Sequence, residues 1–320
     1  MLQRTDLGGG GLRSTVLALA LRATVRPVIT AWTLAPRLPW PYGVVDHAGR
    51  FLRPVRDTGY ARYRLPHCSA TRVTPPEGSA TGRTVVYLHG GAFLVGGHHL
   101  HRQLLGRVAV RTGAEVLAPQ YRKLPRHTVS DALADALDAY RHALDHGADP
   151  TRTVLMGDSA GGFLAVMLAV EIQRAGLPAP AGVVAMSPLV DMVAGDVPYP
   201  GCTLFPRSAI GRFQALAARV EGRAGRGTDP IDSPTHAPRR GLPPTLVQVS
   251  SAESLYADGV RLAEALADAG VAVELEVWDR QVHVFQAAAG LLPEAAAAIE
   301  RVGDFVERVA TGRARLRAVG

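Results

Sequence analysis

From residue 83 onwards the chain alternates short apolar runs with longer segments of helical periodicity, and this alternation limits the fold more than any other feature. A short apolar run between turn-forming residues is typical of a buried strand. Apolar residues three and four positions apart are typical of an amphipathic helix. Strands that alternate with helices of this length favour parallel βαβ units. The sequence therefore predicts an α/β fold, with a mostly parallel central sheet and helices on both faces.

The expected strands are 83–89, "AEVLAPQY", "TRTVLMGDS", "AGVVAMSP", "PTLVQVSS" and "VAVELEVW". The expected helices are 99–111, "VSDALADALDAYRHALDHG", "AGGFLAVMLAVEIQRAG", "SLYADGVRLAEALADAG" and 293–311. An arginine-rich insert, from about 190 to 243, interrupts the pattern. We interpret its arginines as a solvated face, with recognition of an anionic substrate or membrane surface as the alternative; they are Arg207, Arg212, Arg219, Arg223 and Arg226.

Composition and charge narrow the classes of partner. The chain has a net charge of +7, which by itself could suggest an anionic partner. However, Lys123 is the only lysine and the arginines are scattered, so we interpret the charge as compositional bias. No finger, helix-turn-helix or aromatic-basic motif indicates nucleic-acid binding. Cys68 and Cys202 are too far apart for a CxxC site, and a reducing cytoplasm is the expected location.

The N-terminal stretch "STVLALALRATVRPVITAWTLA" is apolar but interrupted. Arg22 and Arg26 would each cost about 2.5–3.5 kcal/mol at a bilayer centre, and Pro27 breaks the run further, so the stretch is too polar to span a membrane. Its apolar core, residues 16–21, is short for a signal peptide and lacks a clear cleavage site. We therefore expect one or two amphipathic helices that pack on the protein or over an entrance.

The stretch "MGDSAGG" gives the strongest local signal. Gly157, Ser159 and Gly161 form G-x-S-x-G, with Asp158 inside the motif, between an expected strand and an expected helix. At a nucleophile elbow the serine occupies a tight turn, and its neighbours two positions away must be small because a Cβ would collide across the turn. The sequence therefore predicts Ser159 as a nucleophile.

A serine hydroxyl needs a neighbouring base that a carboxylate holds in one tautomer. In this kind of fold the partners follow in the order serine, acid, histidine. Only His236 and His283 follow Ser159, and only His283, in "WDRQVHVFQ", follows the last expected strand. The acid is expected at the end of the strand "PTLVQVS", where Glu253 is the first candidate and Asp258 the second. Asp258 is the better candidate for a structural role near a helix start.

The stretch "VVYLHGGAFLVGG" places two glycines directly after an expected strand. Glycines let a ligand approach the backbone closely, and fixed N–H groups stabilise the oxyanion that forms during acyl transfer. We expect Gly90 and Gly91 to supply two such donors and Ala160, directly after the nucleophile, a third. His89 is expected to brace this loop through its ring nitrogens.

Together these motifs resemble the hormone-sensitive-lipase-like esterases of the α/β-hydrolase fold, over about residues 84–306. "HGGAF" is similar to the family's HGGG signature, "GDSAGG" to its elbow and "YRKLP" to its YRLAP; "SPLVDM", "GLPPTLVQVSSAE" and "WDRQVHVFQ" follow in the expected order. The chain departs from the pattern at Ala92, where the third glycine of HGGG would stand, and at Glu253, where the family more often has Asp. The resemblance implies a helical cap over the sheet and short or medium acyl chains.

The expected organisation is an N-terminal cap over residues 1–60 and a catalytic domain over 61–320, with a cap insertion at about 190–240. His98, His99 and His101 lack companion ligands, and neither a metal nor a cofactor is predicted. The predicted partner is a small-molecule ester, with no nucleic acid and no membrane. A homodimer through the last strand, "VAVELEV", is expected if that strand forms an exposed edge.

The resulting hypothesis is a serine carboxylesterase with Ser159, Glu253 and His283 as its triad. The same triad would also serve thioester, amide or lactone hydrolysis, or acyl transfer to an alcohol. A lipase anchored at a membrane by the N-terminal helix and a non-catalytic ligand receptor on this fold are the remaining alternatives.

Overall fold

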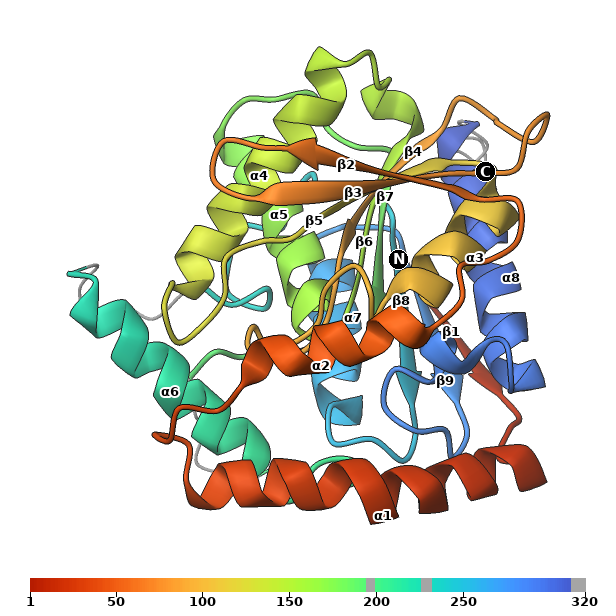
Figure 1. Ribbon diagram of the computed structural model, residues 1–320. Helices are drawn as coiled ribbons and strands as arrows, with labels where there is room; N and C mark the ends of the chain where they lie inside the picture. Colours follow the sequence, from red (N-terminus) through yellow and green to blue (C-terminus); the bar gives the residue numbers. More distant parts are fainter. Residues whose placement is uncertain (194–198, 226–231, 312–320) are drawn as a thin grey trace.

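A single nine-stranded sheet runs through the part of the chain that this computed structural model describes, residues 1–193, 199–225 and 232–311 (Figure 1). Its order is β1-β9-β8-β7-β6-β4-β5-β3-β2. The first seven strands in this order are parallel, whereas β3 pairs antiparallel with β5 and β2 with β3. The strands are β1 Leu2–Leu7, β2 Gly59–Arg64, β3 Ser69–Thr74, β4 Thr84–Leu88, β5 Glu115–Pro119, β6 Thr153–Asp158, β7 Gly182–Met186, β8 Thr245–Ser250 and β9 Val273–Trp278. The predicted α/β fold is confirmed.

Helices cover both faces of this sheet, and the described segments also contain three short 3₁₀ turns. The helices are α1 Leu12–Leu34, α2 Tyr42–Ala48, α3 Arg102–Thr112, α4 Val129–Asp145, α5 Ala160–Arg174, α6 Ala209–Arg223, α7 Tyr256–Asp268 and α8 Pro293–Ala310. The 3₁₀ turns are η1 Gly49–Phe51, η2 Pro150–Arg152 and η3 Phe285–Ala288.

The sheet separates two hydrophobic clusters because successive side chains of a strand point to opposite faces. In β4, Val86 and Leu88 join the cluster that contains α4, α5 and α7, whereas Val85 and Tyr87 join the cluster that contains α3 and α8. Every residue of β6, β7 and β8 is buried. This double burial explains why these strands are continuous apolar runs rather than alternating ones.

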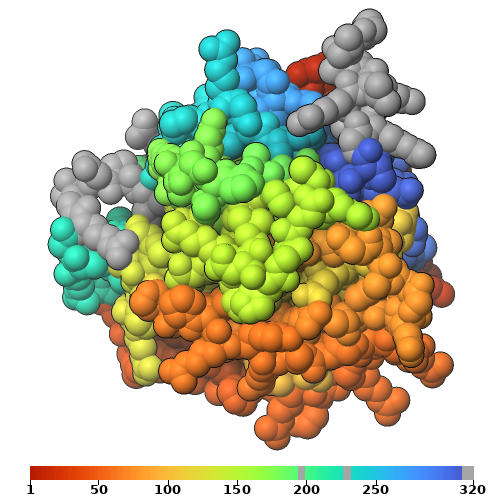
Figure 2. All heavy atoms as spheres, turned by 90° about the horizontal axis from the view of Figure 1, so that it is seen from above, coloured from red at the N-terminus to blue at the C-terminus, as the bar shows by residue number. Residues whose placement is uncertain are grey.

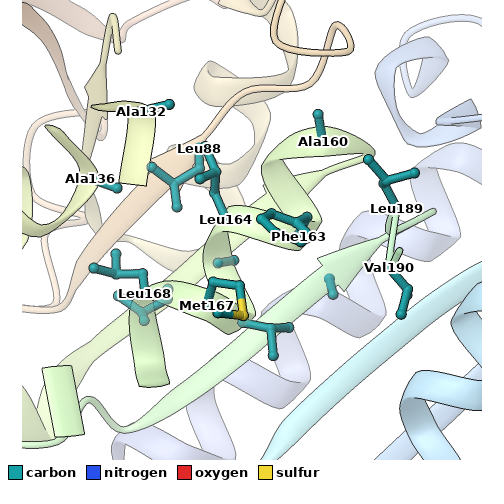
Figure 3. Close-up of a cluster of buried hydrophobic side chains, with 14 of the residues drawn as sticks. Leu88, Ala132, Ala136, Ala160, Phe163, Leu164, Met167, Leu168, Leu189 and Val190 are labelled. Carbon is teal, nitrogen blue, oxygen red and sulfur yellow. The ribbon is translucent and has the colours of Figure 1, made fainter. Parts of the chain in front are cut away.

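Helix α5 is the most deeply embedded helix of the first cluster. Twelve of its fifteen residues are buried, which matches its uniformly apolar sequence. Its side chains Phe163, Leu164, Met167 and Leu168 lie among those of neighbouring elements (Figure 3). The helix therefore holds the turn that precedes it, at Ser159, in a rigid position.

Three helices form a cap on the side to which the carboxyl ends of the parallel strands point: α1, α2 and α6 (Figure 1). The first two fall in the expected N-terminal cap and the third in the expected insertion. On α6, Phe213, Leu216 and Val220 are buried against the body. Of the insert's arginines, Arg207, Arg212 and Arg223 are exposed and Arg219 is half-buried, whereas Arg226 lies outside the described residues.

The N-terminal residues correct two expectations. Leu2–Leu7 form β1, which pairs in parallel with β9 from Leu2–Val273 to Leu7–Trp278, so the first residues belong to the sheet and not to the cap. The strand "VAVELEV" is therefore not an exposed edge, because β1 covers it. β1 is mostly exposed and polar, and backbone pairing holds it, which leaves no apolar signal in its sequence.

The other edge of the sheet is the antiparallel hairpin β2–β3. The expected boundary at residue 60 falls inside β2, so this hairpin belongs to the sheet rather than to a separate cap. Figure 2 views the molecule from above, away from α1, and shows the orange segment with this hairpin across the lower part of that face.

Candidate active site

The turn between β6 and α5 carries Ser159 in a strained conformation. Its φ is 54° and its ψ −118°, values that a non-glycine residue adopts only where the surroundings enforce them. A Cβ on Gly157 would lie 2.1 Å from the carbonyl oxygen of Gly161, and one on Gly161 would lie 1.9 Å from that of Leu88. Both glycines are therefore required by backbone contact, as the G-x-S-x-G pattern predicts.

Three side chains from distant segments meet at this turn. His283 Nε2 lies 3.0 Å from Ser159 Oγ, and His283 Nδ1 lies 2.5 Å from Glu253 Oε2. The histidine and the glutamate are buried, whereas Ser159 is half-buried. With the proton on Nδ1, the imidazole donates to the carboxylate, and its Nε2 lone pair is free to accept the serine proton. The structure thus brings together the serine, the histidine and the first-choice acid.

The loop that carries His283 follows β9 and is tied to two other strand ends. Val284 N donates to Ser187 Oγ over 3.2 Å, just after β7, and Ser250 Oγ at the end of β8 donates to Gln281 O over 2.6 Å. Phe205, from the insert, lies edge-on to the His283 ring with 5.0 Å between ring centroids. The two hydrogen bonds hold the loop on the strand ends, and Phe205 covers the His283 ring from the cap side.

Glu253 is itself oriented by the backbone. Its Oε1 accepts a 2.8 Å hydrogen bond from Ser250 N, which leaves Oε2 for His283. Because a glutamate has one methylene more than an aspartate, this second hydrogen bond fixes where the longer side chain ends. The turn after β8 thus accommodates a glutamate where the family more often has an aspartate.

Asp258 lies elsewhere and has other partners. Its carboxylate accepts hydrogen bonds from Tyr199 Oη (3.0 Å), Val190 N (3.3 Å) and Arg261 Nη2 (2.7 Å). Burial raises the pKa of this carboxyl, and Arg261 and Tyr199 partly offset the rise. Asp258 therefore ties α7 to the start of the insert, and no contact joins it to His283 among the described residues.

The loop after β4 corrects one expected donor. Gly90 N donates to Asp158 Oδ1 over 3.0 Å, so this N–H already has an acceptor. A Cβ at Gly90 would lie 2.2 Å from Asp158 Oδ2, which explains the glycine. The sequence could not show that the carboxylate next to Ser159 reaches this loop.

The N–H groups of Gly91, which is one of the expected donors, and of Ala92 are the candidate donors that remain in this loop. Gly91 has φ +116° and Ala92 has φ 53°, and within the described chain neither N–H has an acceptor. Ala160 N, in the first turn of α5, is equally unbonded there, as expected for a helix N-terminus. Sequence reasoning missed Ala92, although its position in HGGAF was a usable signal.

Asp158 holds a buried polar cluster behind this loop. Besides Gly90 N, it accepts from Tyr87 Oη over 2.7 Å, and His101 Nε2 lies 3.5 Å away. Burial alone would lower the pKa of His101, but the carboxylate of Asp158 outweighs it and raises this pKa. Burial acts to raise the pKa of Asp158, yet His101, Tyr87 and Gly90 together lower it. The carboxylate thus stays charged and fixes the loop.

His89 lies behind the same loop and not against Ser159. Its Nδ1 lies 2.8 Å from Gly90 O, and its ring stacks on Tyr121 with 4.3 Å between centroids. Burial lowers the pKa of His89 well below its ordinary value, so the ring is neutral. These contacts match the expected bracing role.

One cluster has the residue types of a metal site. Single ligand atoms of Asp46, His98 and His99 lie within 4.8 Å of one another. However, Arg62 contacts His98 Nε2, and Arg102 donates to His99 Nδ1 over 2.9 Å. Two guanidinium groups on the imidazole lone pairs disfavour a cation there. The absence of a metal stays a prediction.

Comparisons with known proteins agree with this geometry. Residues 85–287 match the family described as the alpha/beta hydrolase fold. Esterase LipU of Mycobacterium tuberculosis is 40% identical over 90% of this chain and 99% of its own length. Carboxylesterase/phospholipase LipF of the same organism is 38% identical over 97% of this chain and 85% of its own.

A solved structure supports the same family. The crystal structure of an esterase from the bacterial hormone-sensitive lipase family superposes with a TM-score of 0.80 and 30% identity, over 94% of this chain and 99% of that one. The fold of nearly the whole chain is thus shared with a bacterial esterase of that family. The chain belongs to the α/β-hydrolase family and, within it, to the hormone-sensitive-lipase-like esterases, which makes it a carboxylic ester hydrolase.

Proposed function

We propose that Ser159 is the nucleophile of this esterase, His283 its general base and acid, and Glu253 the acid of the triad. The observation that carries this assignment is the continuous chain from Ser159 Oγ through His283 to Glu253. In the first half-reaction Oγ attacks the ester carbonyl carbon while His283 Nε2 takes the hydroxyl proton. The alcohol then leaves with that proton.

The second half-reaction repeats these steps with water. His283 removes a proton from water, hydroxide attacks the acyl-enzyme, and the carboxylic acid leaves as Ser159 regains its proton. In both halves the negative charge on the former carbonyl oxygen is stabilised by the backbone N–H groups of Gly91, Ala92 and Ala160. Loss of one such donor typically costs about 10²–10³ in rate.

We propose short- to medium-chain acyl esters as substrates. A relative from Streptomyces hygroscopicus, 39% identical over 77% of this chain and 81% of its own length, is named an acetyl-hydrolase. A neighbouring structure, EstE5, was soaked with p-nitrophenyl butyrate. Phe205 over the ring of His283 supports a covered site on the cap side. A cytoplasmic location is proposed as well, supported by Cys68 and Cys202, which form no disulfide.

The test is hydrolysis of p-nitrophenyl esters from acetate to palmitate, with Ser159→Ala beside the wild type. We expect a maximum at short chains and a loss of rate on the order of 10⁵–10⁶ in the variant, because the nucleophile is removed. A variant that kept most of the activity would refute the nucleophile. A maximum at long chains would favour the lipase, and no turnover by folded protein would favour acyl transfer or a receptor.

A further inference from the structure

Helix α1 exposes more apolar surface than a helix at an ordinary protein surface. Only 6% of its most apolar 18-residue window is buried. Leu12, Leu19 and Leu34 are 80%, 61% and 81% exposed, and Val16 and Val28 are more than half exposed. Contiguous exposed apolar surface marks a site of interaction with a protein or a membrane.

Most of the exposed apolar residues share one side of the helix, and Val25 and Val28 lie off it. At 100° per residue, a single stripe contains Leu12, Val16, Leu19, Ala23, Pro27 and Leu34, all of them exposed; we call this stripe the α1 face. The opposite side attaches the helix to the body, where Ser14 is buried and donates to Gln281 Oε1 over 3.1 Å, and Trp32 is buried. The α1 face is thus the side that has no partner in the described structure.

The helix cannot cross a membrane while the fold is intact. On its N-terminal side β1 is paired with β9, and on its C-terminal side Trp32 is buried in the hydrophobic cluster that contains α4, α5 and α7. Both ends are therefore held on the same body, and α1 lies across the cap along its whole length (Figure 1). A helix fixed in this way can lie in the plane of a membrane surface but cannot span the bilayer.

Charge decides which partner fits. Residues 8–56 contain seven arginines and one acidic residue, Asp46, a net charge of +6. Six of these arginines are exposed: Arg13, Arg22, Arg37, Arg50, Arg53 and Arg56. The segment after α1 exposes further apolar side chains, namely Leu38, Val44, Val45, Phe51 and Leu52. An apolar stripe flanked by arginines is the composition of a helix that binds anionic lipid.

Arg13 and Arg22 lie on either side of the stripe on α1 itself. We propose that the α1 face docks on the surface of an anionic lipid membrane, with its apolar side chains among the acyl chains and Arg13 and Arg22 at the lipid headgroups. A second copy of this chain is disfavoured on the same face, because it would bring the exposed Arg13 and Arg22 of two copies together. This proposal takes up the alternative raised from the sequence, a protein anchored at a membrane by its N-terminal helix, against the first expectation of no membrane partner.

Docking would turn the active-site side towards the lipid. Arg26 of α1 donates to Cys202 O, and Cys202 N donates to Phe205 O over 2.9 Å. Phe205 in turn covers His283. Helix α1 is therefore connected through residues 202–205 to the proposed catalytic base. A docked enzyme could receive ester substrates directly from the membrane. That consequence rests on the proposed function, whereas the docking itself does not.

The test is flotation of the purified full chain with vesicles, at low and high salt. We expect the protein to float with vesicles that contain phosphatidylglycerol, to remain below with vesicles of phosphatidylcholine alone, and to be released by high salt. The double variant Val16→Glu with Leu19→Glu is expected to bind anionic vesicles about tenfold or more weakly. Leu291→Glu, which changes an exposed leucine outside the cap, is the matched control and should float like the wild type.

A second pair of variants tests the charge. Arg13→Glu with Arg22→Glu should weaken flotation, and Arg64→Glu, on exposed β2, should not. Circular dichroism and Tm check that each variant is folded. Wild-type protein that fails to float with anionic vesicles, or folded glutamate variants of the α1 face that float unchanged, would overturn the proposal. A dimer that the α1-face variants disrupt, without flotation, would assign the face to a second copy. None of these readouts depends on ester hydrolysis.

Discussion

Glu253 and Asp258 are separated by four residues in the chain, yet they have unrelated surroundings. Glu253 Oε2 faces His283 Nδ1, whereas Asp258 contacts Tyr199, Val190 and Arg261. In the proposed mechanism the negative charge of Glu253 stabilises the imidazolium of His283. The negative charge of Asp258 joins the insert to α7.

We expect Glu253→Gln to lower kcat by about 10³–10⁴, because the neutral amide no longer stabilises the imidazolium or its tautomer. Asp258→Asn should change kcat far less but lower Tm, since it weakens the hydrogen bond from Arg261. Steady-state kinetics on p-nitrophenyl butyrate and thermal unfolding measure the two effects. A larger loss of kcat in Asp258→Asn than in Glu253→Gln would move the triad acid.

At this scale, the serine was predictable because G-x-S-x-G is a pattern of neighbouring residues, and the histidine because only His283 follows the last expected strand. The donor assigned to Gly90 was wrong for the opposite reason. Its N–H is taken by Asp158, a contact between segments 68 residues apart, and no pattern in the sequence encodes it. Ala92, with a positive φ, was hidden because alanine rarely signals this conformation.

Among the elements, the junction of β4, β6 and α5 tolerates the least change. The backbone of Gly161 lies against Leu88 O, and neither segment can withdraw, because both are buried in the core. This close approach of helix and strand is what presents Ser159 above the ends of the strands.

We therefore expect Gly161→Ala to lower the free energy of unfolding by more than about 4 kcal/mol or to prevent folding, as a backbone clash in a buried junction does. Gly222→Ala is the matched control: it also adds one methyl group to a helix, but nothing lies within 4 Å of its Cβ. In α6 it should raise stability by up to about 1 kcal/mol. Urea unfolding of both variants measures the difference, and a folded Gly161→Ala of near wild-type stability would contradict the geometry.

The elements that sequence analysis found are those with a burial pattern of their own. β6, β7 and β8 are apolar because both their faces are covered, and α4 and α8 carry one apolar stripe each. β1 has neither property. Its six residues are placed by hydrogen bonds to β9, and backbone groups are the same in every sequence.

For the whole molecule, β1 forms the edge of the sheet next to β9. Deletion of residues 2–7 should uncover the edge of β9, whose unpaired N–H and C=O groups would then pair with another copy. We expect a lower Tm and association that increases with concentration, measured by size-exclusion chromatography with light scattering. A deletion variant that stayed monomeric at the wild-type Tm would show that β1 contributes nothing. A homodimer through "VAVELEV" in the intact chain would first have to displace β1.

The distribution of charge also becomes visible only at this scale. The arginines are spread along the sequence and were interpreted as compositional bias, but Arg13 and Arg22 lie on either side of one apolar face of α1. Sequence periodicity described α1 correctly as a helix. It could not show which side of that helix the body would leave uncovered.

The pairing of Leu2 with Val273 also sets an order of assembly. Closing so long a loop is slow, and the ribosome makes β9 only after β2 to β8. During synthesis β1 therefore cannot pair with β9, and α1 cannot take its final place, until residue 278 has emerged from the ribosome. For most of that time the apolar α1 is a free nascent segment, available to chaperones before its own sheet is complete.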